Sequence, residues 1–351
     1  MLGQDAIARW RDQIRAARAD HTALLIQGSG SKRFLGPAKH VPMQLIDTRD
    51  HHGIVHYDPT ELVLTARAGT SLALIEAALA EHRQMLAFEP PHLGPGATLG
   101  GAVASGLAGP RRPWAGAVRD FVLGCRLVDA EGELLRFGGE VMKNVAGYDL
   151  SRLMAGSYGS LALIADVSLK VLPVPRARKN LSLAMNASQA LQALAQWRQT
   201  PLPLSAACHD GQRLHLRLEG GEGSVADAAL HLGGEPLDEG FWQALNEQRH
   251  RFFASGPVWR LALPPGCPEL ALPGQQWLDW GGCQRWLCSD EPAQRILQAA
   301  KEAGGHARPW RNVPGQVPHA LEPRLVPLHQ RLKAAFDPHG VFNPGWLHPE
   351  V

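Results

Sequence analysis

Three segments rich in glycine and serine lie in the first half of the chain, and their residue types suit a ligand that carries phosphate. They are QGSGSK at 27–32, GPGATLGGAVASGLAGP at 94–110 and AGSYGS at 155–160. Small residues let backbone N–H groups approach a phosphate or a flat ring closely. A helix that starts at Thr98 would direct its positive end toward an anion. The three segments therefore predict a site for a dinucleotide cofactor.

The alternative is that these glycines only mark turns, and for QGSGSK alone both interpretations stay open. The density of glycines in the second segment distinguishes the two interpretations. Residues 94–116 hold seven glycines, whereas the whole chain has 37 in 351 residues. A turn needs one or two glycines, so the density favours the cofactor site.

Two common nucleotide-binding motifs are not satisfied. A P-loop requires G-x-x-x-x-G-K-[ST], and Lys32 has no glycine at the required distance before it. The Rossmann fingerprint requires G-x-G-x-x-G, and after Gly28 and Gly30 the third glycine is absent, because Arg33 stands there. Neither the P-loop nor the Rossmann motif is present.

The composition is that of a folded globular protein. Glycine and proline make up about 18% of the residues, above the roughly 12% of average usage. Hydrophobic residues at 45% and charged residues at 19% exclude a disordered or collagen-like chain. The net charge is +2 and the arginines are scattered, which argues against a nucleic-acid partner. The length predicts two domains, or one large domain with an inserted lobe.

Cysteine usage and hydropathy bear on the cellular setting. Five cysteines without a C-x-x-C pair favour a reducing cytosol and no cysteine-ligated iron–sulfur cluster. Residues 1–20 have a helical stripe rather than the apolar core of a signal peptide. No run reaches the roughly 18 apolar residues of a membrane span. We therefore expect a cytoplasmic chain that meets a membrane only through partners.

The first half of the chain predicts a small α/β arrangement around the glycine segments. After the first helix we expect strands at 23–26, 43–47, 53–57 and 61–67. Gly69-Thr70-Ser71 would cap a helix at 72–82, with Leu74, Ala77, Ala78 and Leu79 inward. A β-hairpin over 121–139 turns at 130–133, and a long strand over 160–173 closes this half.

Beyond a boundary near Arg176 the pattern mixes strands and helices. We expect strands at 181–185, 205–208, 213–218, 258–263 and 285–288, and helices at 187–199, 224–232, 239–251 and 292–303. This order predicts an α+β lobe. The tail LKAAFDPHGVFNPGWL predicts a helix that stops at Asp337-Pro338 and a tight segment after it.

In this order, the three glycine segments resemble the FAD-binding domain of the vanillyl-alcohol oxidase / p-cresol methylhydroxylase (PCMH) family. Residues from about 60 to 173 and the tail LKAAFDPHGVFNPGWL are similar to one branch, the FAD-binding E subunits of bacterial glycolate oxidases (glycolate dehydrogenases), and WLDWGGCQRWL near residue 280 resembles it too. The resemblance implies an α+β fold: a PCMH-type FAD-binding domain of two subdomains at 1–175, a smaller α+β cap lobe at 176–310, and a C-terminal segment at 311–351 that returns to the flavin.

The resemblance also implies which residues hold FAD. The pyrophosphate would lie on the backbone amides of Gly28, Ser29, Gly30 and Ser31. The diphosphate, ribityl and flavin side would be lined by Gly96, Thr98, Gly100, Gly101, Ala104 and Gly106. The adenine half or diphosphate would be held by Gly156, Ser157, Gly159, Ser160 and Ile164. Asn343, with Pro344 and Gly345, would return to the cofactor.

Some members of the family attach FAD covalently through a histidine in the first glycine loop, sometimes with a cysteine in the second. QGSGSK contains neither residue, so we expect non-covalent FAD. His92 is the nearby alternative linkage site, and a hydrogen-bonded loop histidine explains it as well. We expect no metal.

Oxidation of a 2-hydroxy acid by a flavin needs a cation for the carboxylate and a base or metal-bound alkoxide for the hydroxyl proton. Competent relatives carry a G-H-x-G-D-G-N-x-H motif, of which CHDGQRLH at 208–215 keeps only part. We interpret His209 and His215 as exposed strand residues. Arg111, Arg112 and Tyr148 are the catalytic candidates. A solvated loop is the alternative for the arginines, and a hydrogen bond inside the fold is the alternative for Tyr148.

Several of the ten tryptophans fall in the second lobe, among them Trp242, Trp259, Trp277, Trp280 and Trp286. They predict either a packed core or a surface for a partner, since tryptophan is enriched at interface hot spots.

The resemblance implies the FAD-binding subunit of a glycolate oxidase complex, an FAD-dependent 2-hydroxy-acid dehydrogenase. Electrons from glycolate or D-lactate would pass through flavin to an iron–sulfur subunit, and a sister FAD subunit would bear most of the substrate chemistry. Two alternatives stay open. One is a free-standing FAD oxidoreductase of another small substrate, and the other is a scaffold that has kept the fold and lost the flavin.

Overall fold

The computed structural model describes residues 2–37, 42–139, 149–314 and 321–346. The chain divides into two compact units, one made of 1–108, 116–173 and 320–351 and the other of 109–115 and 174–319. The domain boundaries expected above, at 175 and 310, remain a prediction. The compact units differ from that expectation in two respects, because the short segment 109–115 belongs with the second unit and that unit extends to 319.

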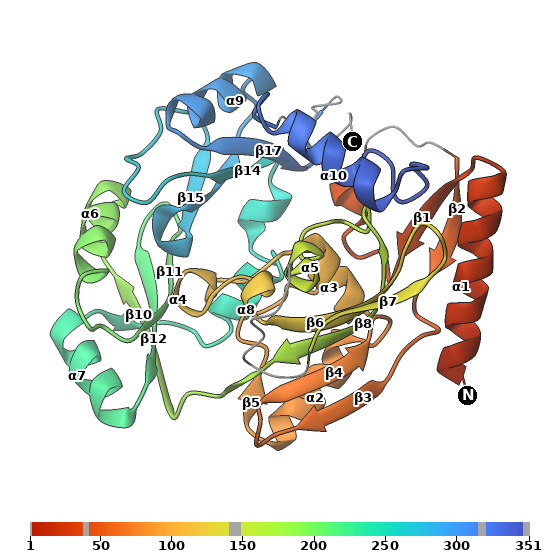
Figure 1. Cartoon of the computed structure of the whole chain (residues 1–351). Helices are drawn as coiled ribbons and strands as arrows, with labels where there is room; N and C mark the ends of the chain where they lie inside the picture. Colours follow the sequence, from red (N-terminus) through yellow and green to blue (C-terminus); the bar gives the residue numbers. More distant parts are fainter. Residues whose placement is uncertain (1, 38–41, 140–148, 315–320, 347–351) are drawn as a thin grey trace. The chain divides into compact units, whose positions relative to one another are not determined.

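The first unit combines an antiparallel five-stranded sheet with a small parallel pair (Figure 1). Its strands are β1 (Ala23–Gln27), β2 (Met43–Asp47), β3 (Ile54–Asp58), β4 (Val63–Arg67), β5 (Gln84–Met85), β6 (Val122–Val128), β7 (Leu134–Gly138), β8 (Leu163–Lys170) and β9 (Leu172–Pro173). Its helices are α1 (Leu2–Ala19), α2 (Leu72–Glu81), α3 (Leu99–Ser105), α5 (Leu150–Leu153) and α10 (Val326–Phe336), with 3-10 turns η1 (Arg33–Leu35) and η2 (Val118–Asp120).

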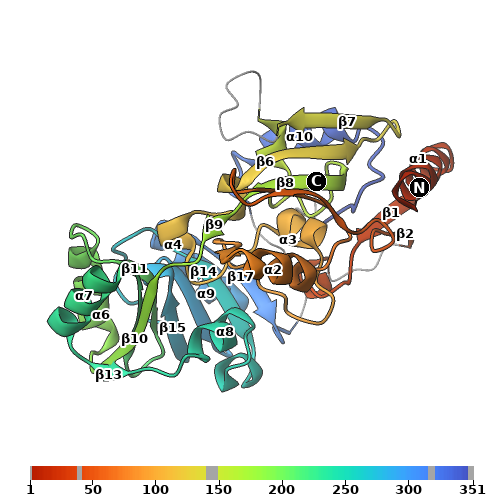
Figure 2. The same ribbon diagram turned by 90° about the horizontal axis from the view of Figure 1, so that it is seen from below.

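The five strands follow the order β3-β4-β8-β6-β7, and Figure 2 shows β8, β6 and β7 side by side. The predicted hairpin is β6–β7, joined by the turn after Val128. β1 and β2 pair in parallel, and β5 pairs with β9. The predicted strands of this half are therefore confirmed, with most ends shifted by one or two residues, but the long strand expected over 160–173 is β8 followed by the short β9, and β5 was not predicted.

The N-terminal helix packs through the stripe that its sequence predicts. Ile7, Trp10 and Ile14 are buried, because their spacing of three or four residues places them on one face of α1. They share a core with Leu24 of β1 and with Phe342 near the C-terminus. Leu24 and Phe342 also form a parallel bridge, so the C-terminal segment returns to the side of β1.

One prediction for α2 is wrong. Leu74 is 46% exposed and Ala77 is exposed too, whereas Leu72, Ile75 and Leu79 are fully buried. The helix starts as predicted, since Ser71 is the N-cap and its Oγ accepts a hydrogen bond from the Leu74 N–H. Leu72, Ile75 and Leu79 recur every three or four residues and form the buried stripe, and Leu74, two residues after Leu72, lies on the opposite side of the helix.

The second unit is built on one eight-stranded antiparallel sheet with the order β13-β10-β12-β11-β15-β16-β14-β17. Its strands are β10 (Ala177–Leu183), β11 (Leu204–His209), β12 (Leu214–Gly220), β13 (Glu235–Pro236), β14 (Val258–Ala262), β15 (Gln275–Asp279), β16 (Gln284–Cys288) and β17 (His306–Arg311). Its helices are α4 (Arg112–Ala115), α6 (Ala187–Trp197), α7 (Glu222–Leu232), α8 (Phe241–Asn246) and α9 (Ala293–Glu302), with 3-10 turns η3 (Arg251–Ala254) and η4 (Trp280–Gly282).

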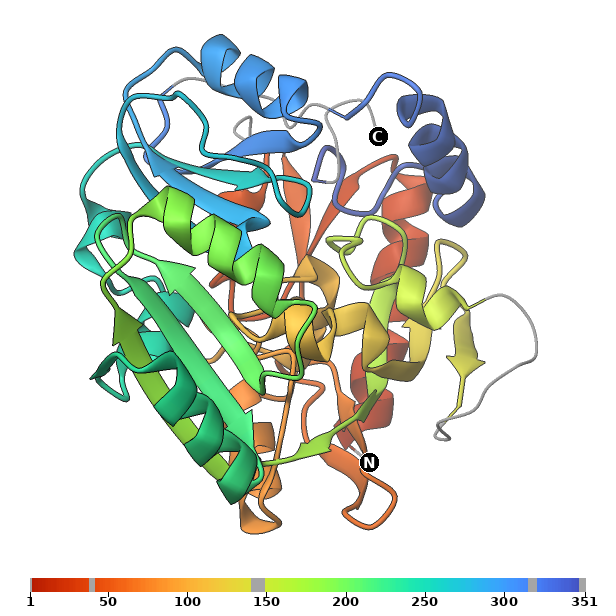
Figure 3. The same cartoon turned by 90° about the vertical axis from the view of Figure 1, so that its left-hand side faces the viewer.

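Helices α6, α7 and α9 lie along this sheet (Figure 3). Along β12, Leu214, Leu216 and Leu218 join the core under α6 and α7, and the polar residues between them point to the other face. The predicted helix at 239–251 is wrong in extent. It consists of α8 and η3, separated by Gln248 with a φ of +56°. The sequence also missed β15 and β17.

Of the five tryptophans named above, four are buried: Trp242, Trp259, Trp280 and Trp286. Their burial supports the interpretation as core residues. Among the described helices, none has the length and apolar character needed to cross a bilayer.

Candidate cofactor site

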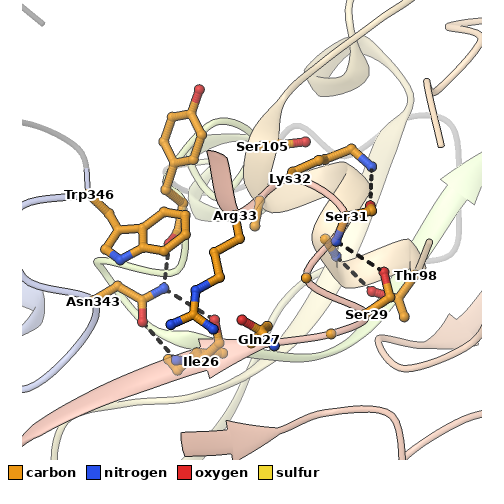
Figure 4. A pocket seen from close by; sticks show the side chains of 15 residues that line it. Ile26, Gln27, Ser29, Ser31, Lys32, Arg33, Thr98, Ser105, Asn343 and Trp346 are labelled. Carbon is orange, nitrogen blue, oxygen red and sulfur yellow. Dashed lines mark hydrogen bonds between the residues drawn. The ribbon is translucent and has the colours of Figure 1, made fainter. Parts of the chain in front are cut away.

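A cavity that is partly open to solvent lies in the first unit where the three glycine segments meet (Figure 4). It is lined by Ile26, Gln27, Gly28, Ser29, Gly30, Ser31, Lys32, Arg33, Thr98, Gly101, Ala104, Ser105, Tyr158, Asn343 and Trp346. Segments from both ends of the chain and from its middle therefore form one wall.

The cavity brings together half of the residues that the resemblance implied. Those that line it are Gly28, Ser29, Gly30, Ser31, Thr98, Gly101, Ala104 and Asn343. Those that are not among its lining residues are Gly96, Gly100, Gly106, Gly156, Ser157, Gly159, Ser160 and Ile164. The lining also includes seven residues that the sequence analysis had not assigned: Ile26, Gln27, Lys32, Arg33, Ser105, Tyr158 and Trp346. All seven lie within or next to the quoted motifs, and this closeness is the signal that could have found them.

Several glycines outside the lining let the segments pack on one another. A Cβ on Gly106 would lie 3.0 Å from the backbone of Gly156, and one on Gly159 would lie 2.9 Å from Asn343 Nδ2. Both Gly106 and Gly159 have positive φ, at +63° and +69°. The cradle would therefore be filled or pushed apart by side chains at these positions.

Helix α3 begins where the sequence predicts. Thr98 is its N-cap, and Thr98 Oγ1 accepts a hydrogen bond of 3.3 Å from the Gly101 N–H. A Cβ on Gly28 would lie 2.3 Å from the same Oγ1. The first glycine loop therefore packs directly on the start of α3, which requires glycine at 28.

Asn343 lines the cavity, but its amide bonds to the protein backbone. Oδ1 accepts from the Ile26 N–H at 2.7 Å, and Nδ2 donates to Ile26 O at 3.3 Å and to Tyr158 O at 2.7 Å. The residue is 2% exposed, with φ of +40°. Its main role in this arrangement is to join β1, the third glycine segment and the C-terminal segment.

The charge of the lining is positive. It includes Lys32 and Arg33, and no aspartate or glutamate is among the lining residues. Lys32 Nζ donates to His92 O at 3.1 Å and to Ser31 Oγ at 3.4 Å. An anionic ligand is thus favoured by Coulomb attraction.

Two polar atoms of the lining are buried without a hydrogen-bond partner among the described residues: Gln27 Oε1 and Trp346 Nε1. A buried polar group that lacks a partner costs about 1–3 kcal/mol, so such atoms are often found beside a ligand. Together with the glycine cradle and the two cations, they fit a ligand that carries a diphosphate and hydrogen-bonding rings, as FAD does.

Arg111, a catalytic candidate, belongs to the second unit and is 6% exposed. Its Nη2 lies 2.5 Å from Glu219 Oε2, and Glu219 Oε1 also accepts from Arg178 Nε at 2.7 Å. Burial acts to raise the pKa of Glu219, but the guanidinium groups of Arg217 and Arg111 outweigh it and hold that pKa below its usual value. The interpretation of Arg111 as part of a solvated loop is therefore wrong.

The other two catalytic candidates are Arg112 and Tyr148. The Arg112 guanidinium lies 4.4 Å from the centre of the Trp280 ring, a cation–π contact within the second unit. Trp280 Nε1 in turn donates to Gly109 O at 3.0 Å. Tyr148 lies outside the described residues.

His209 and His215 are buried at 1% and 4% exposure, so their interpretation as exposed residues is wrong. His209 Nε2 lies 2.9 Å from Met185 O, and His215 Nε2 lies 2.9 Å from Asp210 Oδ2. Burial acts to raise the pKa of Asp210, but hydrogen bonds from His215 and from backbone N–H groups outweigh it and hold that pKa well below its usual range. In the parts of the chain that the structure describes, no group of three or more His, Cys, Asp or Glu is arranged for a metal ion.

Comparison with known proteins identifies the class of fold and the family. A family described as "FAD binding domain" matches residues 7–138. The fold also resembles a solved structure of alkyldihydroxyacetonephosphate synthase, with a TM-score of 0.66 at 15% identity over 95% of this chain and 73% of that one. These matches establish the class: the fold is the mixed α+β, PCMH-type FAD-binding fold, as predicted.

The family follows from a relative of full length. Glycolate oxidase subunit GlcE of Escherichia coli (strain K12) is 52% identical over 341 residues, which cover 97% of each chain. The chain therefore belongs to the GlcE family of FAD-linked glycolate oxidase subunits. Glycolate oxidase subunit GlcD of Bacillus subtilis (strain 168) is 38% identical over 99 residues, 28% of this chain and 21% of that protein. A D-lactate dehydrogenase of Anaerostipes hadrus is 35% identical over 123 residues, 35% of this chain and 26% of that protein.

Proposed function

We propose that this chain is the FAD-binding subunit of a glycolate oxidase complex that oxidises glycolate, or D-lactate, to the 2-oxo acid. The observation that carries the proposal is the cavity at which the three glycine segments meet, in a chain 52% identical to an E. coli protein named as a glycolate oxidase subunit. The B. subtilis subunit and the D-lactate dehydrogenase each match part of this chain, which supports a small 2-hydroxy acid as substrate.

FAD, when bound, would accept the two electrons released by oxidation of the hydroxy acid. The residues of this chain that would hold it are the lining residues of the first glycine loop, Gly28 to Ser31, with Thr98 and Gly101. The backbone amides of the loop are suited to the diphosphate. Gly96, Gly100, Gly106, Gly156, Gly159 and their neighbours would shape the cradle from behind the lining.

We infer that FAD is held without a covalent bond. Neither histidine nor cysteine is found among the cavity-lining residues. The nearby His92 has another partner, since its Nε2 lies 3.1 Å from Glu76 Oε1. FAD should therefore leave the protein on denaturation, and acid precipitation should leave all flavin absorbance in the supernatant.

Partners complete the proposed complex. A GlcD-like sister subunit with its own FAD would bear most of the substrate chemistry, and an iron–sulfur subunit would take the electrons. The ion pair of Arg111 with Glu219 supports this division, because that guanidinium is engaged within the second unit. Arg112 and Tyr148 remain proposed candidates for contact with substrate. The five cysteines are free thiols, in keeping with a cytoplasmic complex that reaches a membrane through its partners.

The experiment is a flavin spectrum with and without substrate. The purified chain should show flavin absorbance that anaerobic glycolate or D-lactate leaves unbleached, and addition of the sister subunit should permit bleaching. Bleaching of the chain alone would support a free-standing oxidoreductase instead. A chain that takes up no flavin after reconstitution with FAD would be a scaffold, and the proposal would be wrong.

A further inference from the structure

Arg33 lies at the cavity, and its side chain has no partner among the described residues. It opens η1, directly after the first glycine loop, and its backbone N–H donates to Gly30 O at 2.9 Å. Its side chain is exposed and lines the cavity. Within the described part of the chain, the guanidinium has no hydrogen bond or ion pair, unlike Arg9, Arg18 and Arg49, which all pair with carboxylates.

The turn that carries Arg33 is held in place from the C-terminal segment. The Gly36 N–H donates to Arg33 O at 3.0 Å and closes η1. A Cβ on Gly36 would lie 2.7 Å from the Trp346 indole, so the ring packs directly on this glycine. The backbone N–H of Trp346 donates to Asn343 O at 3.2 Å, which ties this residue to the buried Asn343. The position of Arg33 is therefore fixed by the cavity's own framework.

The direction of the side chain is toward the cavity. Figure 4 shows the Arg33 guanidinium pointing to the side where Gln27, Asn343 and Trp346 lie, while Lys32 points the other way from the loop. Two cations thus leave the same loop on different sides, and the lining holds no acidic residue to neutralise them. A guanidinium matches the oxygens of a phosphate in a two-pronged geometry, which gives both charge and orientation.

We propose that Arg33 binds the diphosphate of the adenine dinucleotide directly, and that Trp346 holds the Arg33 turn in the position for this contact. The proposal rests on the proposed function, since it assigns a residue to the FAD that the cavity would hold. It adds side-chain charge to the backbone amides of the glycine loop. It also predicts that the chain recognises FAD by its ADP half and discriminates against flavins without a diphosphate.

The test is a titration of the flavin-free full chain with FAD and with riboflavin, followed by flavin fluorescence. Arg33→Gln should weaken FAD binding about tenfold, the loss expected for one charge-assisted hydrogen bond on an exposed group. Riboflavin binding should not change. Arg33→Lys should recover part of the loss, because it keeps the charge without the two-pronged geometry. The matched control is Arg9→Gln, which removes the same charge from α1 outside the cavity.

Ionic strength and a second ligand, ADP, distinguish the possible results of this titration. The Kd for FAD should rise with ionic strength in the unaltered chain, and this dependence should be weaker in Arg33→Gln. ADP alone should displace FAD from the unaltered chain, and its inhibition constant, corrected for the Kd of FAD, should rise in Arg33→Gln by about the same factor as the Kd of FAD. Equal FAD binding by Arg33→Gln and Arg9→Gln would overturn the inference while leaving the proposed function intact. An unaltered chain that binds no FAD would overturn both.

Discussion

Asn343 Oδ1 accepts a hydrogen bond of 2.7 Å from the backbone N–H of Ile26, a residue 317 positions earlier in the chain. The Asn343 Nδ2 donates to Ile26 O and to Tyr158 O. One buried amide therefore joins the strand before the first glycine loop, the third glycine segment and the C-terminal segment. The shape of the cavity therefore depends on the Asn343 side chain, although its amide forms hydrogen bonds with backbone groups of the protein.

Asn343→Asp should weaken both the fold and cofactor binding. The carboxylate keeps the acceptor for the Ile26 N–H but puts an oxygen opposite two carbonyl oxygens, where the amide donated. We expect a loss of about 3 kcal/mol in the free energy of unfolding, measured with urea. Asn343→Gly is the control, because glycine accepts the positive φ and removes the acceptor and the donors together without adding charge. A smaller loss for the aspartate than for the glycine would contradict this account.

Local signals in the sequence predicted the parts of the site that are themselves local. The stripe of Ile7, Trp10 and Ile14 and the start of α3 at Thr98 both follow from spacing and capping within a few residues. Recognition of the glycine segments depended on their order and density. The fold class therefore followed from the sequence, and so did half of the lining.

The remaining features depend on contacts between distant residues. The burial of His209 and His215 depends on a sheet whose neighbouring strands come from distant parts of the chain. The alternation of Leu214 and Leu216 is the same whether the opposite face of the sheet is exposed to solvent or covered by protein. The proposed role of Arg33 could not be predicted from the sequence either, because the residues next to an arginine do not show whether its guanidinium pairs with a carboxylate.

Gly101→Leu should abolish FAD retention and leave the fold intact. Gly101 lines the cavity, and among the described residues the contact a Cβ there would make within 4 Å is with Thr98 Oγ1 at 3.1 Å. A larger side chain would thus extend into the space for the ligand. The measurement is flavin content by absorbance after purification, with melting temperature as the test of folding. Gly223→Leu in α7 is the control, because a Cβ there meets nothing within 4 Å. Full flavin content in Gly101→Leu would mean that the cofactor lies elsewhere.

Lys333→Met should loosen the C-terminal segment. Lys333 Nζ donates to Ser160 O, Asp337 Oδ2 and Phe342 O at 2.7, 2.7 and 2.8 Å, and the residue is 8% exposed. Removing it leaves the Asp337 carboxylate buried without its cation, which should cost about 3–5 kcal/mol in the free energy of unfolding.

The check on Lys333→Met is the urea midpoint together with hydrogen exchange over residues 321–346. Lys301→Met, an exposed position on α9, is the control for loss of one lysine charge. If the two variants unfold at the same urea concentration, the buried bonds of Lys333 contribute nothing measurable to stability.

Glu219→Gln should destabilise the second unit in a manner that depends on pH. The Glu219 carboxylate lies among Arg111, Arg178 and Arg217 and its side chain is 1% exposed. Removing the negative charge leaves buried guanidinium groups without a counter-charge, so we expect the free energy of unfolding to fall by about 3–5 kcal/mol near pH 7. Glu235→Gln is the control, since its side chain is 73% exposed and its pair with Arg213 should contribute no more than about 1 kcal/mol.

The sign of the pH dependence follows from the lowered pKa of Glu219 in the folded chain. An unfolded glutamate has a pKa of about 4.3, so between that value and the lower folded one the unfolded state binds more protons. The stabilisation by Glu219 is complete above a pH of about 4.3 and is lost as the pH falls through the folded pKa. Urea unfolding of both proteins across this range should bring the curves of Glu219→Gln and the unaltered chain together at low pH. A difference that stays constant down to the lowest pH would mean that the shape of the side chain, rather than its charge, stabilises the cluster.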